Sequence, residues 1–247
     1  MCNPACIEFA REHLEPWEVR DRAVLEAGAL DVHGGLRPII QRLGPARYVG
    51  VDLTPGPGVD EVCDARDLLD RFGPHSFDVL LSTELLEHVR DWQQVIHGFK
   101  QVTRPGGVLL LTTRSRGHPY HAYPDDFWRF ELDDMRQIFG DFEIEALQED
   151  PIEVGVFLKA RKPHEFHERS LADIALYSMV TRRRTKTLAP WRAVLFRAQV
   201  ESRRRFAHLR YLVWDAAMRL APRPLKRLIK RRLLPLYALF RNPPHGK

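Results

Sequence analysis

The segment from Arg22 to Ala65 constrains the fold of this chain more than any other part of the sequence. An apolar run stops at Glu26 and enters a loop that contains Gly28, and apolar residues at helical spacing follow over residues 36–43. A second apolar run then ends at Asp52. The order strand, glycine loop, helix, strand and acid is typical of sites that hold a nucleoside-containing cofactor at the carboxyl ends of parallel strands.

The loop distinguishes between two classes of cofactor. Dinucleotide-binding proteins favour G-x-G-x-x-G, because the pyrophosphate must approach bare backbone at a helix N-terminus. If Gly28 is taken as the first glycine of this motif, Leu30 stands in the place of the second, and Glu26 precedes the loop. A carboxylate at that point repels a pyrophosphate and attracts a cationic amine. We therefore predict S-adenosylmethionine, which carries an ammonium and a sulfonium but no phosphate, with Asp52 accepting hydrogen bonds from its ribose hydroxyls.

The charge is distributed unevenly along the chain. Residues 1–163 carry 18 Lys/Arg and 28 Asp/Glu, whereas residues 164–247 carry 20 Lys/Arg and 5 Asp/Glu, so net charges of −10 and +15 underlie the overall +5. We predict a cofactor-binding domain at 1–163, followed by a basic, helical extension at 164–247. The sequence contains neither an apolar run of 18 residues nor a signal-peptide pattern, so we expect a cytoplasmic protein.

Further strand patterns follow the cofactor segment. FDVLLS at 77–82 reads as a buried strand, and Pro105-Gly106-Gly107 turns the chain into a second one at 108–111. The last two runs, at 142–147 and 154–160, are joined by a short connection around Pro151. This spacing predicts an antiparallel hairpin at the edge of the sheet.

These segments in this order resemble the class I S-adenosylmethionine-dependent methyltransferases over about residues 22–160. The matching segments are VLEAG (24–28), VGVD (49–52), CDA (63–65), FDVLLSTELLEHV (77–89) and RPGGVLLLTT (104–113). The resemblance implies an α/β fold, with a seven-stranded, mostly parallel Rossmann-like sheet flanked by helices and its last strand antiparallel. The basic helical C-terminal extension lies outside the resemblance.

The resemblance also implies a set of cofactor-binding residues. Glu26 and Gly28 would contact the methionine end and Asp52 the ribose. The remaining residues of the set are Asp31 and Gly34 in the glycine loop, Leu53 beside the ribose acid, Asp64 and Ala65 at the adenine, and Thr83 beneath the methionyl group. Leu30 breaks the E-x-G-x-G-x-G pattern of the family, so Asp31, His33, Gly34 and Gly35 are expected to complete a longer loop.

Methyl transfer is an in-line displacement in which alignment matters most, and an oxygen nucleophile usually also needs a base. We predict His88, His121 and Asp126 as catalytic residues. The predicted substrate-binding residues are Tyr120, Tyr123, Trp128 and Arg129, all in the polar aromatic loop after residue 114. Two structural alternatives stay open: His88 satisfied by backbone at a helix start, and a loop whose aromatic residues only pack on the core.

A metal ion is not predicted. His118, His121, Asp125 and Asp126 are of ligand type, but their spacing fits no defined metal site.

Some methyl acceptors are disfavoured by the turn after residues 77–82. Ser82-Thr83-Glu84-Leu85 does not match the D/N-P-P-Y/F turn of enzymes that methylate amino groups of DNA bases, and no cysteine lies near it for attack on a pyrimidine. We predict O-methylation of a small molecule, a sugar or glycan, or a lipid-linked intermediate. The alternatives are a non-catalytic scaffold acting through its basic tail and an RNA-directed methyltransferase.

The basic tail alternates arginine clusters with apolar residues. Residues 222–240 form the pattern of an amphipathic basic helix, which is typical of segments that bind membrane surfaces, partners or nucleic acids. We predict that this segment binds an anionic membrane at its inner face. Packing on the acidic domain is a second interpretation, and nucleic acid is a weaker one.

Overall fold

The computed structural model of the chain describes residues 3–31, 34–121, 125–220 and 222. It divides into two compact units, residues 1–188 and 189–247. The boundary expected near Lys162–Pro163 precedes this division, because residues 164–188 belong to the first unit.

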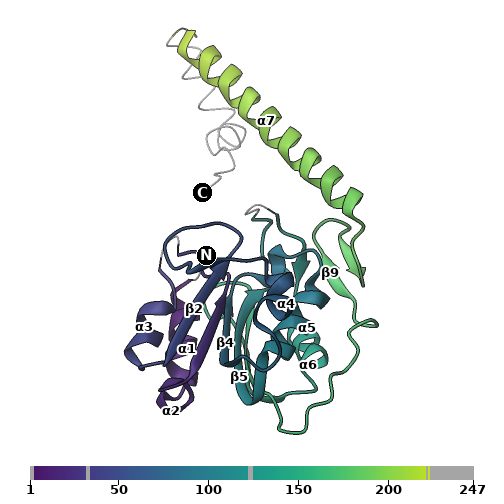
Figure 1. Cartoon of the computed structure of the whole chain (residues 1–247). Helices are drawn as coiled ribbons and strands as arrows, with labels where there is room; N and C mark the ends of the chain where they lie inside the picture. The colour runs from purple at the N-terminus through teal and green to yellow at the C-terminus, as the bar shows by residue number, and fades with distance from the viewer. Residues whose placement is uncertain (1–2, 32–33, 122–124, 221, 223–247) are drawn as a thin grey trace. The chain divides into compact units, whose positions relative to one another are not determined.

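The first unit is built on a seven-stranded sheet with the strand order β3-β2-β1-β4-β5-β8-β7 (Figure 1). The strands are β1 (Ala23–Ala27), β2 (Arg47–Asp52), β3 (Glu61–Val62), β4 (Phe77–Thr83), β5 (Thr103–Arg114), β7 (Glu143–Glu149) and β8 (Gly155–Arg161). The pairs from β3 to β5 are parallel, and β8 is antiparallel to both of its neighbours. The predicted mostly parallel, seven-stranded sheet and its edge hairpin are therefore confirmed.

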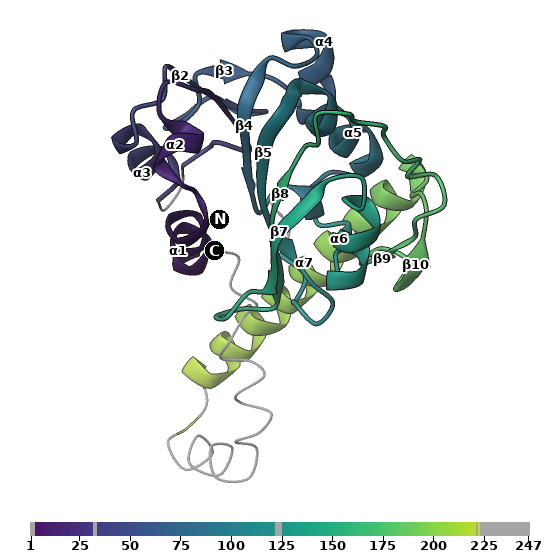
Figure 2. The same cartoon turned by 90° about the horizontal axis from the view of Figure 1, so that it is seen from below.

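Helices cover both faces of this sheet. Helices α1 (Pro4–His13), α2 (Pro16–Val19) and α3 (Arg37–Arg42) lie on one side, and α4 (Leu68–Phe72), α5 (Trp92–Val102) and α6 (Leu132–Ile138) lie on the other (Figure 2). Two 3₁₀ turns, η1 (Ala65–Asp67) and η2 (Leu86–His88), follow β3 and β4. Because both faces are covered, the central strands are apolar at successive positions, as Val24 and Leu25 show.

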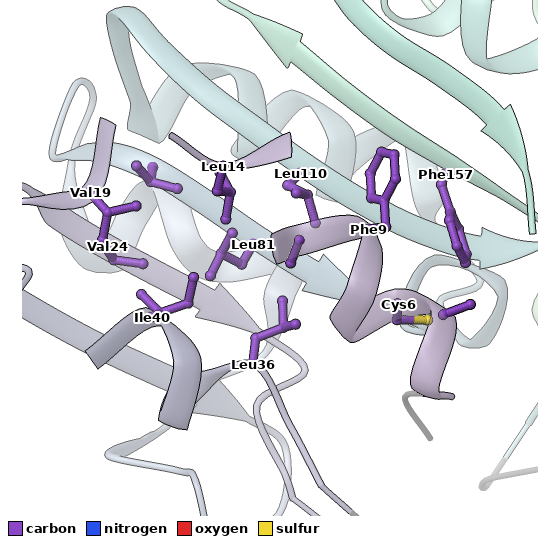
Figure 3. Close-up of a cluster of buried hydrophobic side chains, with 13 residues drawn as sticks. Cys6, Phe9, Leu14, Val19, Val24, Leu36, Ile40, Leu81, Leu110 and Phe157 are labelled. Atoms are coloured by element: carbon purple, nitrogen blue, oxygen red, sulfur yellow. The ribbon is translucent and has the colours of Figure 1, made fainter. Parts of the chain in front are cut away.

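A cluster of buried hydrophobic side chains lies between α1, α3 and the sheet (Figure 3). The cluster joins residues from both helices to residues of four strands: Cys6, Phe9, Leu36, Ile40, Val24, Leu81, Leu110 and Phe157. Asn3 begins α1 by accepting the backbone N–H groups of Ala5 and Cys6 through its side chain, so the helix is capped where it meets the sheet.

A small three-stranded sheet, in the order β10-β9-β6, also belongs to the first unit. It consists of β6 (Trp128–Arg129), β9 (Leu176–Ser178) and β10 (Arg183–Thr185), all antiparallel. Its first strand comes from the polar aromatic loop and the other two from residues after the predicted domain boundary. The sequence patterns did not predict this sheet.

The second unit contains the helix α7 (Pro190–Leu220). The prediction of a helical extension is confirmed over these residues. The amphipathic segment 222–240 lies outside the described residues except for Pro222. Among the residues that the structure describes, no helix is both long and apolar enough to cross a membrane.

Candidate cofactor and acceptor site

The predicted cofactor residues come together because their strands are adjacent and parallel. Asp52 and Thr83 are the last residues of β2 and β4, Glu26 is the last but one of β1, and Asp64 follows β3. Since these strands run side by side in the order β3-β2-β1-β4, their carboxyl ends form one edge of the sheet. This edge is where open α/β sheets bind ligands.

Glu26 is a buried acid at this edge, with 4% of its surface exposed. Its carboxylate accepts a hydrogen bond from the Tyr48 hydroxyl, whereas the nearby Arg37 forms an ion pair with Asp60. Burial raises the pKa of Glu26 to about 7, and the Tyr48 hydrogen bond and the Arg37 charge oppose that rise only in part. A cationic ligand group would stabilise the ionised form of this acid.

Gly28 fits the position that the resemblance gives it. Its φ angle of +80° is one that side chains disfavour, and a Cβ built there would lie 3.2 Å from Cβ of Leu85. The contact shows that the loop after β4 packs directly on the glycine loop after β1. The predicted acceptor residues and the predicted cofactor residues therefore lie on neighbouring loops.

The Asp52 carboxylate is oriented by the backbone. Its Oδ1 accepts the N–H of Thr54 at 3.0 Å, and its Oδ2 accepts the N–H of Leu30 at 3.3 Å. A carboxylate has about four acceptor positions, so two stay available for ribose hydroxyls. Leu53, the next residue, is 63% exposed and presents an apolar surface beside this acid.

The predicted adenine residues begin η1. Asp64 caps this turn by accepting the Arg66 backbone N–H at 2.9 Å, and its other oxygen accepts the Arg66 guanidinium at 2.6 Å. These bonds lower the pKa of Asp64 against the opposing effect of burial. Ala65 is buried. Asp64 thus has a defined local role, and its contact with an adenine stays a prediction.

The glycine loop closes through a side-chain bond. Asp31 Oδ1 accepts the backbone N–H of Gly34 at 2.6 Å, and Gly34 has a φ of +114° that favours glycine. The predicted participant His33 lies outside the described residues.

The residues at this edge fit S-adenosylmethionine chemically. A buried acid at Glu26 suits an ammonium group, the oriented Asp52 suits vicinal hydroxyls, and the bare backbone of Gly28 allows close approach.

The pH dependence of cofactor affinity tests the role of Glu26. Only the ionised carboxylate pairs with an ammonium, and with a pKa of about 7 it is mostly protonated below pH 7. The charged and polar groups that face it are Tyr48, Arg37, Asp31 and the backbone of Leu36. We expect the affinity for S-adenosylmethionine to fall roughly tenfold from pH 7 to pH 5.5.

Isothermal titration calorimetry over this range measures the effect, since the amino group of the cofactor stays charged there. Glu26→Gln is the control: it should bind more weakly at pH 7 and show little change with pH. A wild-type affinity that is constant between pH 5.5 and 7 would contradict the assignment.

On the acceptor side, η2 and the loop after β5 form a cluster of buried polar groups. His88 Nδ1 contacts the backbone oxygen of Asp125, which agrees with the structural alternative for one of its nitrogens. His121 lies between two carboxylates, with Nδ1 3.0 Å from Asp126 Oδ2 and Nε2 3.7 Å from Glu87 Oε1. Burial acts to lower the pKa of His121, but these two acids raise it to about 9.

The predicted catalytic residues His88, His121 and Asp126 are therefore brought together. Sequence reasoning missed Glu87, which is completely buried. The signal available was its place in LLEHV, one residue before a histidine that was already a candidate.

Asp126 and Arg129 form a fully buried ion pair. Arg129 Nη2 donates to Asp126 Oδ2 at 2.7 Å, and the guanidinium also donates to the backbone oxygens of His118, Pro119 and Trp128. Burial acts to raise the pKa of Asp126, but hydrogen bonds from Arg129 and His121 lower it to about 2. The buried pair therefore holds the backbone of the loop after β5 in place through the bonds of Arg129 to His118 and Pro119.

The other predicted substrate residues differ in exposure. Trp128 is completely buried, and its indole donates to the backbone oxygen of Arg90 at 3.0 Å. Its neighbours Phe127 and Phe130 are buried as well, as the packing alternative requires. Tyr120 is half-buried, and Tyr123 lies outside the described residues.

A second buried charge network adjoins this cluster, and sequence reasoning did not find it. Glu84 has a φ of +56°, is 5% exposed and forms an ion pair with Arg114. Arg114 also reaches Asp150 at 3.3 Å and Glu153 at 2.7 Å. A non-glycine residue held in this left-handed conformation at a ligand-binding edge is typical of functional sites.

Comparison with known proteins shows which proteins this chain is similar to. A methyltransferase domain family matches residues 25–111. The ubiquinone biosynthesis O-methyltransferase of Xanthomonas axonopodis pv. citri is 32% identical over 128 residues, which cover 46% of this chain and 51% of that protein. That of Idiomarina loihiensis is 28% identical over 127 residues, covering 46% and 50%. The chain thus spans about half the length of the relatives it matches.

Solved structures give the same fold. The 1,6-didemethyltoxoflavin-N1-methyltransferase of Burkholderia thailandensis, with bound 1,6-didemethyltoxoflavin and S-adenosylhomocysteine, aligns with a TM-score of 0.52 and 20% identity over 65% of this chain and 77% of that one. Geranyl diphosphate C-methyltransferase from Streptomyces coelicolor aligns with a TM-score of 0.52 and 14% identity over 64% and 77%. At these identities the likeness concerns the fold.

Proposed function

We propose that this chain, whose fold and central domain are those of the class I S-adenosylmethionine-dependent methyltransferases, transfers a methyl group to a hydroxyl oxygen. The observation that best supports this proposal is the arrangement of residues at the carboxyl edge of the sheet. Glu26, Gly28 and Asp52 lie there beside η2 and the loop after β5, which together hold two histidines, His88 and His121, and the two buried carboxylates of Glu87 and Asp126.

The oxygen acceptor is supported by the relatives, which are named O-methyltransferases. Our preferred acceptor is a small molecule. A glycan and a lipid-linked intermediate are the other acceptors that we propose. S-adenosylmethionine, when bound, supplies the methyl group. An acceptor hydroxyl would lie beside His121 and His88, and the buried Asp126 and Arg129 would position the loop that carries His121.

The experiment is a screen for methyl uptake from labelled S-adenosylmethionine into extracted metabolites and glycans. We expect a product with the wild-type chain and less of it with Asp52→Ala at cofactor concentrations that only just saturate the wild type. His121→Ala should lower turnover more than cofactor affinity, since His121 is assigned to the acceptor side. Intact cofactor binding without methyl transfer to any fraction would favour the non-catalytic scaffold.

We further propose that the basic C-terminal part binds an anionic membrane surface and brings the enzyme to a membrane-proximal acceptor. Residues 164–247 carry a net charge of +15. Within the second unit, α7 combines the arginines 203–205 with exposed apolar side chains such as Trp191, Leu209 and Val213. Each Lys/Arg near such a surface contributes about 1 kcal/mol to the free energy of membrane binding. Apolar groups buried in the membrane add a hydrophobic contribution that salt does not screen.

Vesicle co-sedimentation measures this binding. The full chain should pellet with anionic vesicles but not with zwitterionic ones, less so at high salt, and less when Leu228, Ile229 and Leu233 become serine. The comparison chain ends at Leu188, since residues up to that point belong to the first unit. Equal pelleting of both chains, or of neither, would contradict the proposal, and salt-sensitive binding to RNA would favour the nucleic-acid alternative.

A further inference from the structure

Three potential metal ligands converge on one point of the acceptor-side cluster. Glu87 and His88 come from η2, and His121 comes from the loop after β5. One ligand atom of each lies within 4.8 Å of the ligand atoms of the other two. We propose that these three side chains bind a divalent transition-metal ion.

The outer contacts of the two histidines direct the same ring nitrogen inward. His88 Nδ1 contacts the backbone oxygen of Asp125, and His121 Nδ1 lies 3.0 Å from a carboxylate oxygen of Asp126. A carbonyl oxygen only accepts, so Nδ1 of His88 carries the hydrogen, whereas Nδ1 of His121 faces the Asp126 carboxylate without a hydrogen bond of regular geometry. A carboxylate or carbonyl behind the ring is also the usual support of a metal-binding histidine, because it fixes the ring and makes Nε2 a better ligand.

Both Nε2 atoms face one oxygen of Glu87. The distances to its Oε1 are 3.8 Å from His88 and 3.7 Å from His121. The other oxygen accepts the Thr113 hydroxyl at 2.8 Å, whereas Oε1 has no hydrogen-bond partner among the residues that the structure describes, although the side chain is completely buried. A buried carboxylate oxygen facing two imidazole nitrogens needs a proton or a metal ion between them.

The donor set indicates the class of ion. Imidazole suits zinc, copper, iron and nickel, whereas magnesium and calcium prefer oxygen ligands alone. Around an ion with bonds of about 2.1 Å, tetrahedral ligand atoms lie roughly 3.4 Å apart. The two distances to Glu87 exceed this by a few tenths of an ångström, and the histidine ligand atoms lie within 4.8 Å of each other, so the three side chains would have to move closer together around an ion.

Three protein ligands leave a position free on a four-coordinate ion, as in catalytic metal sites. The loop that carries Glu87 and His88 also carries Leu85, whose Cβ lies 3.2 Å from the place of a Cβ on Gly28. The site therefore adjoins the cofactor side. The role of the ion rests on the proposed function. The acceptor hydroxyl would take the free position, where a metal ion lowers the pKa of a bound oxygen group.

Metal binding is measured on the full, untagged chain after treatment with chelator and dialysis. Equilibrium dialysis against Zn²⁺ should give one ion per chain, with Mg²⁺ bound at least 100-fold more weakly. His121→Ala and the size-matched Glu87→Gln should each weaken Zn²⁺ binding at least tenfold. Circular dichroism establishes that both variants are folded.

His118→Ala is the matched control. Its ring contacts that of His121 at a centroid distance of 4.7 Å, but its Nε2 faces Glu153 rather than Glu87. This variant should keep the wild-type affinity. Binding below one equivalent, or binding that survives both Glu87→Gln and His121→Ala, would overturn the proposal. The readout needs no acceptor, so a failed search for methyl transfer leaves it unaffected.

Discussion

Replacing Asp126 with alanine is expected to lower the free energy of unfolding by about 3–5 kcal/mol, the usual result of removing one partner of a buried ion pair. Asp126 and Arg129 are both completely buried, so the variant would leave a guanidinium in a low-dielectric interior without its counter-charge. Its remaining partners are neutral backbone oxygens of His118, Pro119 and Trp128. These solvate the charge only in part.

Urea unfolding followed by circular dichroism measures this effect. Asp133→Ala is a matched control, because Asp133 and Arg136 also pair at i,i+3 but are 85% and 55% exposed. It should change stability by no more than about 0.5 kcal/mol. Asp126→Ala combined with Arg129→Met should regain part of the loss, since it removes both charges. Equal stability of Asp126→Ala and wild type would show that the pair is not buried in solution.

Replacing Asp52 with alanine is expected to weaken S-adenosylmethionine binding by about 1.5–3 kcal/mol, which corresponds to roughly 10- to 150-fold in affinity. The carboxylate is held by the N–H groups of Leu30 and Thr54, so its free acceptor positions are fixed before the cofactor arrives. Bonds from ribose hydroxyls to a charged, oriented acceptor are among the stronger hydrogen bonds.

Calorimetry on the folded variant measures the change in affinity. Asp70→Ala, an exposed acid on α4, is the control and should bind the cofactor like the wild type. An unchanged affinity of Asp52→Ala would remove Asp52 from the cofactor site.

The cofactor half of the molecule was predictable because its signals are local. The strand, glycine loop, helix and acid between Ala23 and Asp52 follow one another within a short segment, and each has its own residue pattern. Parallel pairing of neighbouring strands then brings Glu26, Asp52 and Thr83 to one edge without further information. The hairpin around Pro151 was equally local.

The acceptor half depended on contacts between distant residues. The pairing of β6 with β9 joins Trp128 to Ser178 through strands of two and three residues, too short for any period to appear in the sequence. In the sequence alone, Glu87 is indistinguishable from an acid on the surface, because its contact with His121 is made only in the folded chain. For the same reason the ion pair of Arg114 with Glu84 was not anticipated.

The pairing of β6 with β9 also determines which pieces of the chain are exchangeable between relatives. The loop that carries His121 is anchored where Trp128 pairs with Ser178, and Phe127 accepts the backbone N–H of Met179 at 2.8 Å. A chimaera that receives this loop alone would pair a foreign β6 with the resident β9. To transfer acceptor specificity from one relative to another, residues 115–131 and 164–188 should therefore have to be exchanged together.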